Sequence, residues 1–140
     1  MGFLIDTSVL IAAERGRFSL ADVVAALGEA PQALAAITAS ELLHGVHRAK
    51  DPAIRERRLR FVEFILALFP IVPFDLDAAR VHAALWARLQ EQGQVIGAHD
   101  LLIAATARML DYGVITLNQD EFQRIPDLTI LIPLRMADIQ

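Results

Sequence analysis

The sequence predicts an α/β fold in which a parallel sheet of about five strands is flanked by helices on both faces. Two observations lead to this class. Short apolar runs recur along the 140 residues, beginning with Phe3-Leu4-Ile5, and segments with the apolar spacing of a helix separate them. Hydrophobic residues make up 55% of the chain and charged residues 21%, which excludes a disordered chain. Strands that alternate with helices pair in parallel, because each crossover returns the chain to the same end of the sheet.

The expected strands are short, apolar and bounded by turn or capping residues. They lie at residues 3–5, 33–37, 71–74, 114–117 and 128–132. The expected helices lie at residues 8–15, 20–27, 42–49 and 52–69, between Asp75 and Gly93, between Gly97 and Gly113, and at residues 118–122. Thr38 and Glu41 fit the capping-box pattern, so we expect the third helix to begin just after them. Trp86 and the phenylalanines are expected in the core.

The composition bounds the location and the class of partner. Nothing resembling a linker or a repeat divides the chain, so we expect one domain over residues 1–140. Cysteine is absent, which excludes thiolate metal sites and fits a reducing cytosol. No apolar run approaches the ~20 residues of a membrane span, and no basic region precedes the first one, so we expect a cytoplasmic protein. The net charge of −4 argues against binding nucleic acid by bulk positive charge, but not against meeting phosphates through metal ions.

Acidic and amide side chains fall where the expected strands meet helices. They are Asp6, Glu41, Asp100 and the turn at residues 118–121. Each has a structural explanation when taken alone: Asp6 and Glu41 as helix-capping residues, Asp100 as an anion in the first turn of its helix, and the turn residues as turn formers. Those explanations are the commoner meaning of each single pattern.

Their combination favours a metal site. The carboxyl ends of parallel strands face one side of a sheet, so Asp6, Glu41 and the turn near Asn118 should converge on one cleft, which Asp100 joins if its helix points there. Clustered carboxylates repel one another unless a cation or shared protons neutralise them. Mg²⁺ prefers such oxygen ligands and keeps waters for substrate phosphates. The sequence therefore predicts an acidic pocket that holds Mg²⁺ or Mn²⁺.

Four segments carry a resemblance to a known family. They read Leu-Ile-Asp-Thr-Ser at 4–8, Ile-Thr-Ala-Ser-Glu-Leu-Leu-His-Gly at 37–45, His-Asp-Leu-Leu-Ile-Ala-Ala-Thr-Ala at 99–107 and Val-Ile-Thr-Leu-Asn-Gln-Asp-Glu-Phe at 114–122. Their order and spacing resemble a PIN-domain protein, and more closely a VapC-type toxin ribonuclease, along the whole chain. The resemblance implies a metal-dependent endoribonuclease that cleaves RNA, is neutralised by a cognate VapB-type antitoxin and is commonly a homodimer.

The resemblance also implies roles for single residues. Asp6 and Asp100 match the carboxylates that bind Mg²⁺ most directly, and Glu41 matches the third acidic residue. Three residues of one turn are candidates for the fourth position: Asn118, Asp120 and Glu121. An amide adds no charge, so Asn118 leaves a second metal ion in question. Three hydroxyl residues are placed to hold the ligands or their waters: Thr7, Ser8 and Thr116.

The charges suggest a mechanism. A metal held by Asp6 and Asp100 would activate water and polarise the phosphodiester, Glu41 would orient that water or accept its proton, and a second metal brought by the substrate would steady the leaving oxygen. Two other classes compete with this hypothesis. A phosphotransferase or phosphatase with an aspartate nucleophile usually needs a second Asp two residues on, where this chain has Ser8. A catalytically weak or inactive domain that only binds a protein partner is the alternative that Asn118 keeps open.

Other polar and apolar groups have two interpretations. A basic stretch crosses the third and fourth helices and is either a solvated surface or a path for RNA: Arg48, Lys50, Arg55, Arg57, Arg58 and Arg60. His99, beside Asp100, is a candidate for a contact with the substrate. His44, His47 and His82 are expected on helix surfaces or in packing. The apolar residues of the first two helices are either core or a groove for an antitoxin segment.

Overall fold

A five-stranded parallel sheet forms the centre of the molecule. The computed structural model describes residues 1–133. The strands lie in the order β3-β2-β1-β4-β5, and every neighbouring pair is parallel. In the central pairs, Leu4 is opposite Ala33 of β2 on one side and Val114 of β4 on the other. The predicted parallel sheet of about five strands is confirmed.

The described residues contain five strands and seven helices. The strands are β1 (Phe3–Ile5), β2 (Gln32–Ala35), β3 (Ile71–Val72), β4 (Gly113–Ile115) and β5 (Ile130–Leu131). The helices are α1 (Thr7–Glu14), α2 (Leu20–Ala26), α3 (Ala36–Arg48), α4 (Pro52–Leu68), α5 (Leu76–Glu91), α6 (Ala98–Leu110) and α7 (Gln119–Phe122). No described helix is long and apolar enough to cross a membrane.

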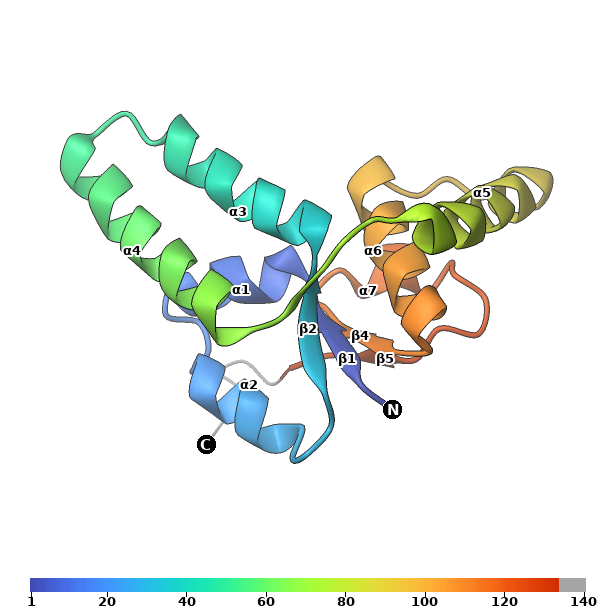
Figure 1. The fold of residues 1–140 in the computed structure, drawn as a ribbon, viewed down its shortest axis with the longest axis horizontal. Helices are drawn as coiled ribbons and strands as arrows, with labels where there is room; N and C mark the ends of the chain where they lie inside the picture. The colour runs from blue at the N-terminus through green and yellow to red at the C-terminus, as the bar shows by residue number, and fades with distance from the viewer. Residues whose placement is uncertain (134–140) are drawn as a thin grey trace.

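Two apolar cores lie on the two faces of the sheet. Residues of α1 to α4 pack with Ile5, Leu34 and Ile115 on one face, and residues of α5 to α7 pack with Leu4 and Val114 on the other. Successive strand residues point to opposite faces, so each short strand supplies both cores. The pairs α3–α4 and α5–α6 extend from the sheet as two arms (Figure 1).

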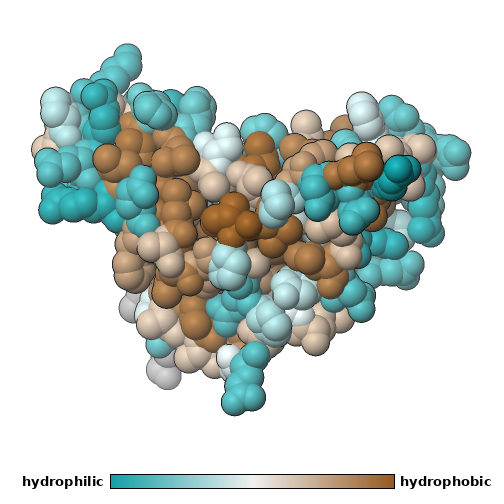
Figure 2. Space-filling model, in the orientation of Figure 1, coloured by the Kyte–Doolittle hydropathy of each residue, from teal (hydrophilic) through white to brown (hydrophobic). Residues whose placement is uncertain are grey.

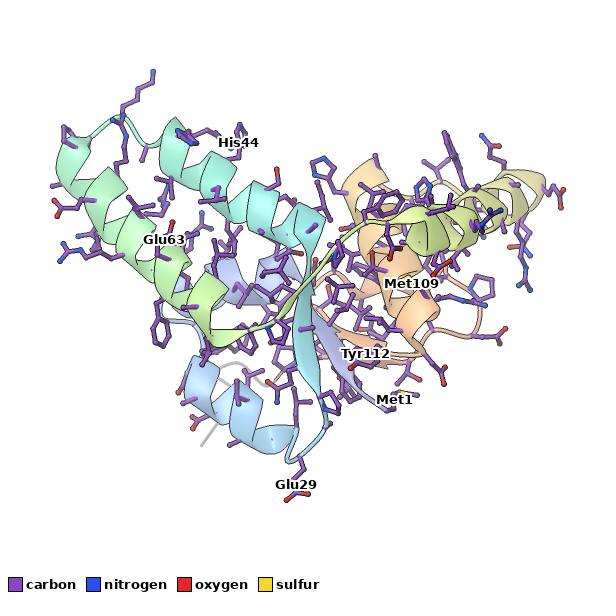
Figure 3. The ribbon with its side chains drawn as sticks, viewed as in Figure 1. Met1, Glu29, His44, Glu63, Met109 and Tyr112 are labelled. Carbon is purple, nitrogen blue, oxygen red and sulfur yellow. The ribbon has the colours of Figure 1, made fainter. Side chains whose placement is uncertain are left out.

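The carboxyl ends of β1, β2 and β4 lie at one edge of the sheet, where α1, α3 and the turn before α7 begin. The opposite edge is built differently: Met1 and Tyr112 lie near each other there (Figure 3), and Gly113 N donates a hydrogen bond to the Gly2 carbonyl at 2.9 Å. Polar side chains that follow the strands therefore gather at the first edge.

The predicted start of the third helix is wrong. Helix α3 begins at Ala36, directly after β2, and its N-cap Ala35 makes no side-chain cap. Thr38 and Glu41 therefore lie inside the helix and form no capping box. Thr38 is fully buried, and its hydroxyl lies 3.2 Å from that of Thr7. Thr38 and Glu41 thus contact Thr7 of α1 and do not cap their own helix.

Gly113 does not end the preceding helix, as its position suggested. Helix α6 ends at Leu110, and Asp111 takes the left-handed conformation with φ of 57°. Gly113 is the first residue of β4, where a Cβ atom would lie 2.7 Å from the Phe3 ring and 2.9 Å from the Thr129 carbonyl. The close approach of β4 to its neighbours requires glycine here.

The expectation that Trp86 and every phenylalanine are core residues is also wrong. Trp86 is 52% exposed and Phe64 59% exposed. Trp86 and Phe74 both pack on the ring of His82, with ring centroids 5.7 Å and 5.5 Å away. Figure 2 shows apolar side chains gathered across the middle of the face between the two arms. The helical spacing on α5 is real, but its aromatic residues cover a surface.

Candidate active site

Asp6 is the most constrained polar residue of the site. It follows β1 as the N-cap of α1, is only 3% exposed and makes no side-chain cap of its own helix. Its Oδ2 instead accepts hydrogen bonds from the Ser8 hydroxyl at 2.6 Å and the Thr116 hydroxyl at 2.7 Å. The carboxylate is thus held between the tips of β1 and β4.

The two hydroxyl groups are themselves oriented by the backbone of the β4–α7 turn. Leu117 N donates to Ser8 Oγ at 3.1 Å, and Asn118 N donates to Thr116 Oγ1 at 2.8 Å. Since each oxygen receives a backbone N–H, its own proton is directed to Asp6. The backbone N–H groups of Leu117 and Asn118 therefore help to fix Asp6 through these two hydroxyl groups.

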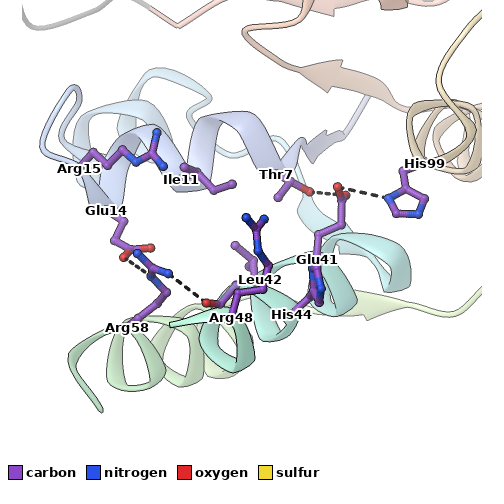
Figure 4. A pocket seen from close by; sticks show the side chains of 11 residues that line it. Thr7, Ile11, Glu14, Arg15, Glu41, Leu42, His44, Arg48, Arg58 and His99 are labelled. Carbon is purple, nitrogen blue, oxygen red and sulfur yellow. Dashed lines mark hydrogen bonds and ion pairs between the residues drawn. The ribbon is translucent and has the colours of Figure 1, made fainter. Parts of the chain in front are cut away.

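Glu41 reaches the same edge from the second turn of α3. Its Oε1 accepts a hydrogen bond from the Thr7 hydroxyl at 2.9 Å, and its Oε2 lies 3.4 Å from His99 Nδ1 at the start of α6 (Figure 4). Glu41 therefore bridges α1 and α6. The contact between Glu41 and His99 gives His99 a place beside the acidic cluster.

Asp100 completes the set from the first turn of α6. Asn118 Nδ2 donates a hydrogen bond to Asp100 Oδ2 at 2.7 Å. The N-terminus of α6 points to the edge where β1 and β4 end. This was the condition under which Asp100 was predicted to join the other carboxylates. Asn118 is therefore tied to a carboxylate through its amide nitrogen, and its oxygen remains the group that can accept or coordinate.

The other two candidates of the turn are placed differently. Glu121 is partly buried, and its Oε2 accepts a hydrogen bond from Gly97 N at 3.1 Å and lies 3.9 Å from Arg124. Asp120 is exposed and forms no side-chain hydrogen bond or ion pair with any described residue. The structure thus brings Asp6, Glu41, Asp100 and Asn118 together, keeps Glu121 at the margin and directs Asp120 away.

Burial and mutual repulsion disfavour the charged carboxylates. Burial raises the pKa of Asp6, against hydrogen bonds from Ser8 and Thr116 that lower it, and the charge of Glu41 raises it further. Burial also raises the pKa of Asp100, and the charges of Asp6, Glu121 and Glu41 add to this, bringing it to about 6. Such shifts mark a cluster in which a bound cation would favour the charged carboxylates.

The donor chemistry of the cluster fits a hard divalent cation. The available atoms are carboxylate and amide oxygens, and the chain has no cysteine. Within residues 1–133, no three acidic or histidine side chains already stand at the spacing of a metal cage. Mg²⁺ does not need such a cage, because it usually binds one or two carboxylates and retains several waters. Asp6 and Asp100 are the pair that can supply those carboxylates.

A groove of about 420 Å³ begins at Glu41, the one carboxylate of the cluster that lines it, and runs between α1, α3 and α4. Glu41, Thr7 and His99 line one end, and Arg15 and Arg48 line its walls farther along (Figure 4). The sequence did not single out Arg15, because it lies apart from the basic stretch of α3 and α4. No pattern in the sequence places it beside Glu41, with which it lines the groove.

The chain is similar to known proteins along most of its length. The sequence model of the PIN domain matches residues 3–128. A protein called Ribonuclease VapC from Rickettsia bellii (strain RML369-C) is 42% identical over 137 residues, which cover 96% of this chain and 99% of the relative. A tRNA(fMet)-specific endonuclease VapC from Shigella flexneri is 28% identical over 90% of this chain and 93% of its own length.

A solved structure has the same fold. The VapBC2 complex of Rickettsia felis, bound to a DNA fragment from its promoter, contains a chain that superimposes with a TM-score of 0.86 at 26% identity. The match covers 96% of this chain and all of that one.

Proposed function

The chain belongs to the PIN domain family, and we propose that its acidic edge cleaves RNA with the help of a divalent metal ion, Mg²⁺ or Mn²⁺. It is a VapC-type endoribonuclease, the toxin of a toxin–antitoxin pair, and its protein partner is a VapB-type antitoxin. Residues 1–140 are proposed to form one PIN domain, because the family match extends over residues 3–128 and a single sheet organises them. We also propose that the toxin forms a homodimer.

The observation that carries the proposal is the arrangement around Asp6. A carboxylate that only capped α1 would accept the backbone N–H of the second or third residue of that helix, whereas Asp6 makes no such side-chain cap. Asp6 is buried, and one of its carboxylate oxygens accepts hydrogen bonds from two hydroxyl groups. It also lies close enough to Asp100 to raise the pKa of that residue. Retaining unneutralised charge in this way costs stability, which a cation with substrate phosphates would offset.

Each residue has a distinct role in the proposal. Asp6 and Asp100 hold the metal, which when bound polarises the phosphodiester and lowers the pKa of a coordinated water. Glu41, fixed by Thr7, orients the attacking water or accepts its proton. Ser8 and Thr116 both donate to Oδ2 of Asp6, and Oδ1 is the atom that we propose for the metal.

For the fourth partner, we assign Asn118 as the residue that positions Asp100. Its amide nitrogen is committed to Asp100 Oδ2 at 2.7 Å, so only its oxygen can contact a metal or its water. Glu121 adds negative charge at the margin, whereas the side chain of Asp120 is exposed and contacts no group of the cluster. Catalysis is therefore expected to depend on Asn118 more than on Glu121, and least on Asp120.

Removing the negative charge of Asp6 tests the proposal most directly. Asp6→Asn keeps an acceptor for Ser8 and Thr116 but loses the metal-binding charge, so cleavage should fall at least about 10³-fold, the effect of losing several kcal/mol of metal stabilisation. The assay follows purified protein on total RNA, with and without EDTA, and maps the cleavage sites. Wild-type cleavage that persists in EDTA, or in Asp6→Asn, would overturn the site. Protein that cuts no RNA under any metal condition would favour the alternative of a protein-binding module.

The mapped sites also identify the substrate. The relative from Shigella flexneri is named for tRNA(fMet), which makes transfer RNA the first class to inspect. Sites confined to messenger or ribosomal RNA would separate this chain from that relative in specificity while leaving the reaction unchanged.

A further inference from the structure

The groove beside the acidic cluster has opposite charge at its two ends. Glu41 and His99 lie at the end nearest Asp6, and Arg15 and Arg48 lie farther along, on α1 and α3 respectively (Figure 4). Glu41 and Arg48 are seven residues apart on α3, so they share one face of the helix, roughly 10 Å apart along its axis.

Three arginines are close to this groove, but only two are available. Arg58 Nε donates to Glu14 Oε1 at 3.2 Å, and its Nη1 donates to the Gly45 carbonyl at 2.9 Å. Arg58 therefore joins α4 to α1 and α3 as a structural link. The side chains of Arg15 and Arg48 are exposed and form no hydrogen bond or ion pair within the part of the chain that the structure describes.

We propose that Arg15 and Arg48 each bind a backbone phosphate of single-stranded RNA close to the bond that is cut. The inference rests on the proposed function and adds the direction in which the strand leaves the acidic cluster: between α1 and α3, toward the end of α1. The roughly 10 Å from Glu41 to Arg48 along α3 places Arg48 within a few nucleotides of the acidic cluster on a bound strand. Guanidinium groups bind phosphate oxygens through paired N–H donors.

The same geometry divides the basic stretch that the sequence presented as one unit. Arg55 Nε donates to the Ala49 carbonyl at 2.8 Å, and Arg60 lies 4.0 Å from Glu56. Arg57 is exposed on α4 and does not line the groove. Of this stretch, Arg48 alone is both available and on the path from the acidic cluster, so Arg57 provides a control with the same charge.

The test measures RNA binding without cleavage. The background is full-length Asp6→Asn protein with Mg²⁺, and the probe is a fluorescent single-stranded RNA of twelve mixed-sequence nucleotides, followed by anisotropy over a range of KCl concentrations. Arg15→Ala/Arg48→Ala should raise the Kd at least tenfold and flatten the plot of log Kd against log[KCl] by about 1.4, since each lost phosphate contact removes ~0.7 for a single strand. Arg57→Ala should change neither value appreciably.

Two further measurements exclude a folding defect and a different ligand. Arg15→Lys/Arg48→Lys, which retains both charges, should recover most of the salt dependence, and thermal melting should be alike in all variants. An unchanged salt dependence in the alanine variant, or no RNA binding by the Asp6→Asn protein, would overturn the proposal. So would arginine-dependent binding of a hexa-aspartate peptide with an unchanged RNA slope, which would assign the groove to an acidic protein segment. Arginine-dependent RNA binding by a wild-type protein that does not cleave would refute the nuclease proposal and leave this one standing.

Discussion

The first and last strand–helix junctions of the site are built in opposite ways. At the β1–α1 junction a single carboxylate, Asp6, is buried and receives two hydroxyl groups at one oxygen. At the β4–α7 junction two side chains donate hydrogen bonds to carboxylates of the cluster: Thr116 to Asp6 and Asn118 to Asp100. The first junction holds one group rigidly, while the second supplies the backbone and side-chain donors that hold it. The later turn thus acts mainly as a support for the earlier carboxylate.

Of the residues that support Asp6 from the β4–α7 turn, Thr116 should have the largest effect on catalysis when it is replaced. Thr116→Val keeps the buried shape but removes the donor to Asp6 Oδ2 and the acceptor for Asn118 N. We expect kcat to fall about 10–100-fold, the usual effect of losing a group that orients a metal ligand. The measurement is cleavage of a mapped RNA site at saturating Mg²⁺.

Thr116→Ser is the matched control, because it retains the hydroxyl and loses only a methyl group. It should keep most of the activity. If both variants lost activity equally, packing at this fully buried position would be responsible, and the hydrogen bond to Asp6 would not be the reason for a threonine here.

How much of this site the sequence could predict differs between the same two junctions. Asp6 was predictable because a short apolar strand followed by a carboxylate and a helix allows one placement only. The role of Glu41 was obscured because Thr38 and Glu41 satisfy a local capping pattern, yet β2 runs directly into α3 and both side chains meet Thr7 instead. Local patterns do not report such tertiary contacts.

The turn after β4 was ambiguous for another reason. Asn118, Asp120 and Glu121 are all plausible ligands within four residues, and a one-turn helix directs each of them differently. Which one faces the cluster depends on the backbone conformation of the turn and on the position of α6. The spacing of residues in the sequence determines neither of them. The groove past Glu41 was unpredictable in the same way, since Arg15 and Arg48 come from separate helices.

The three turn residues offer a smaller but sharper comparison. Asn118→Ala should lower kcat about tenfold, the lower end expected for a residue that orients a ligand, because Asp100 loses its amide donor. Asp120→Asn should stay within about twofold of wild type, as an exposed surface change usually does. A set of single-turnover rates on one RNA site ranks them. A larger loss in Asp120→Asn than in Asn118→Ala would make Asp120 the fourth partner.

The smallest expected effect concerns stability without metal. The pKa of Asp100 is about 6 in the folded protein, above its ordinary value of 3.8. A carboxyl group of this kind binds its proton more tightly when folded, so its contribution to stability is present below about pH 4 and is lost as the pH rises through 6. Asp100→Asn imitates the neutral form and should remove that pH dependence. At pH 7 in EDTA it should raise the free energy of unfolding by about 1 kcal/mol, after allowance for solvent at this partly exposed group.

Urea unfolding at pH 4.5 and pH 7, both in EDTA, measures the difference, with Asp120→Asn as the control that lies outside the cluster. Burial and the nearby charges of Asp6 and Glu121 are what raise the pKa of Asp100, so the same substitution should also weaken the stabilisation that added Mg²⁺ gives the wild type. A variant that is destabilised in EDTA yet gains as much from Mg²⁺ as the wild type would mean that Asp100 serves packing. In that case the metal would rest on Asp6 and a ligand other than Asp100.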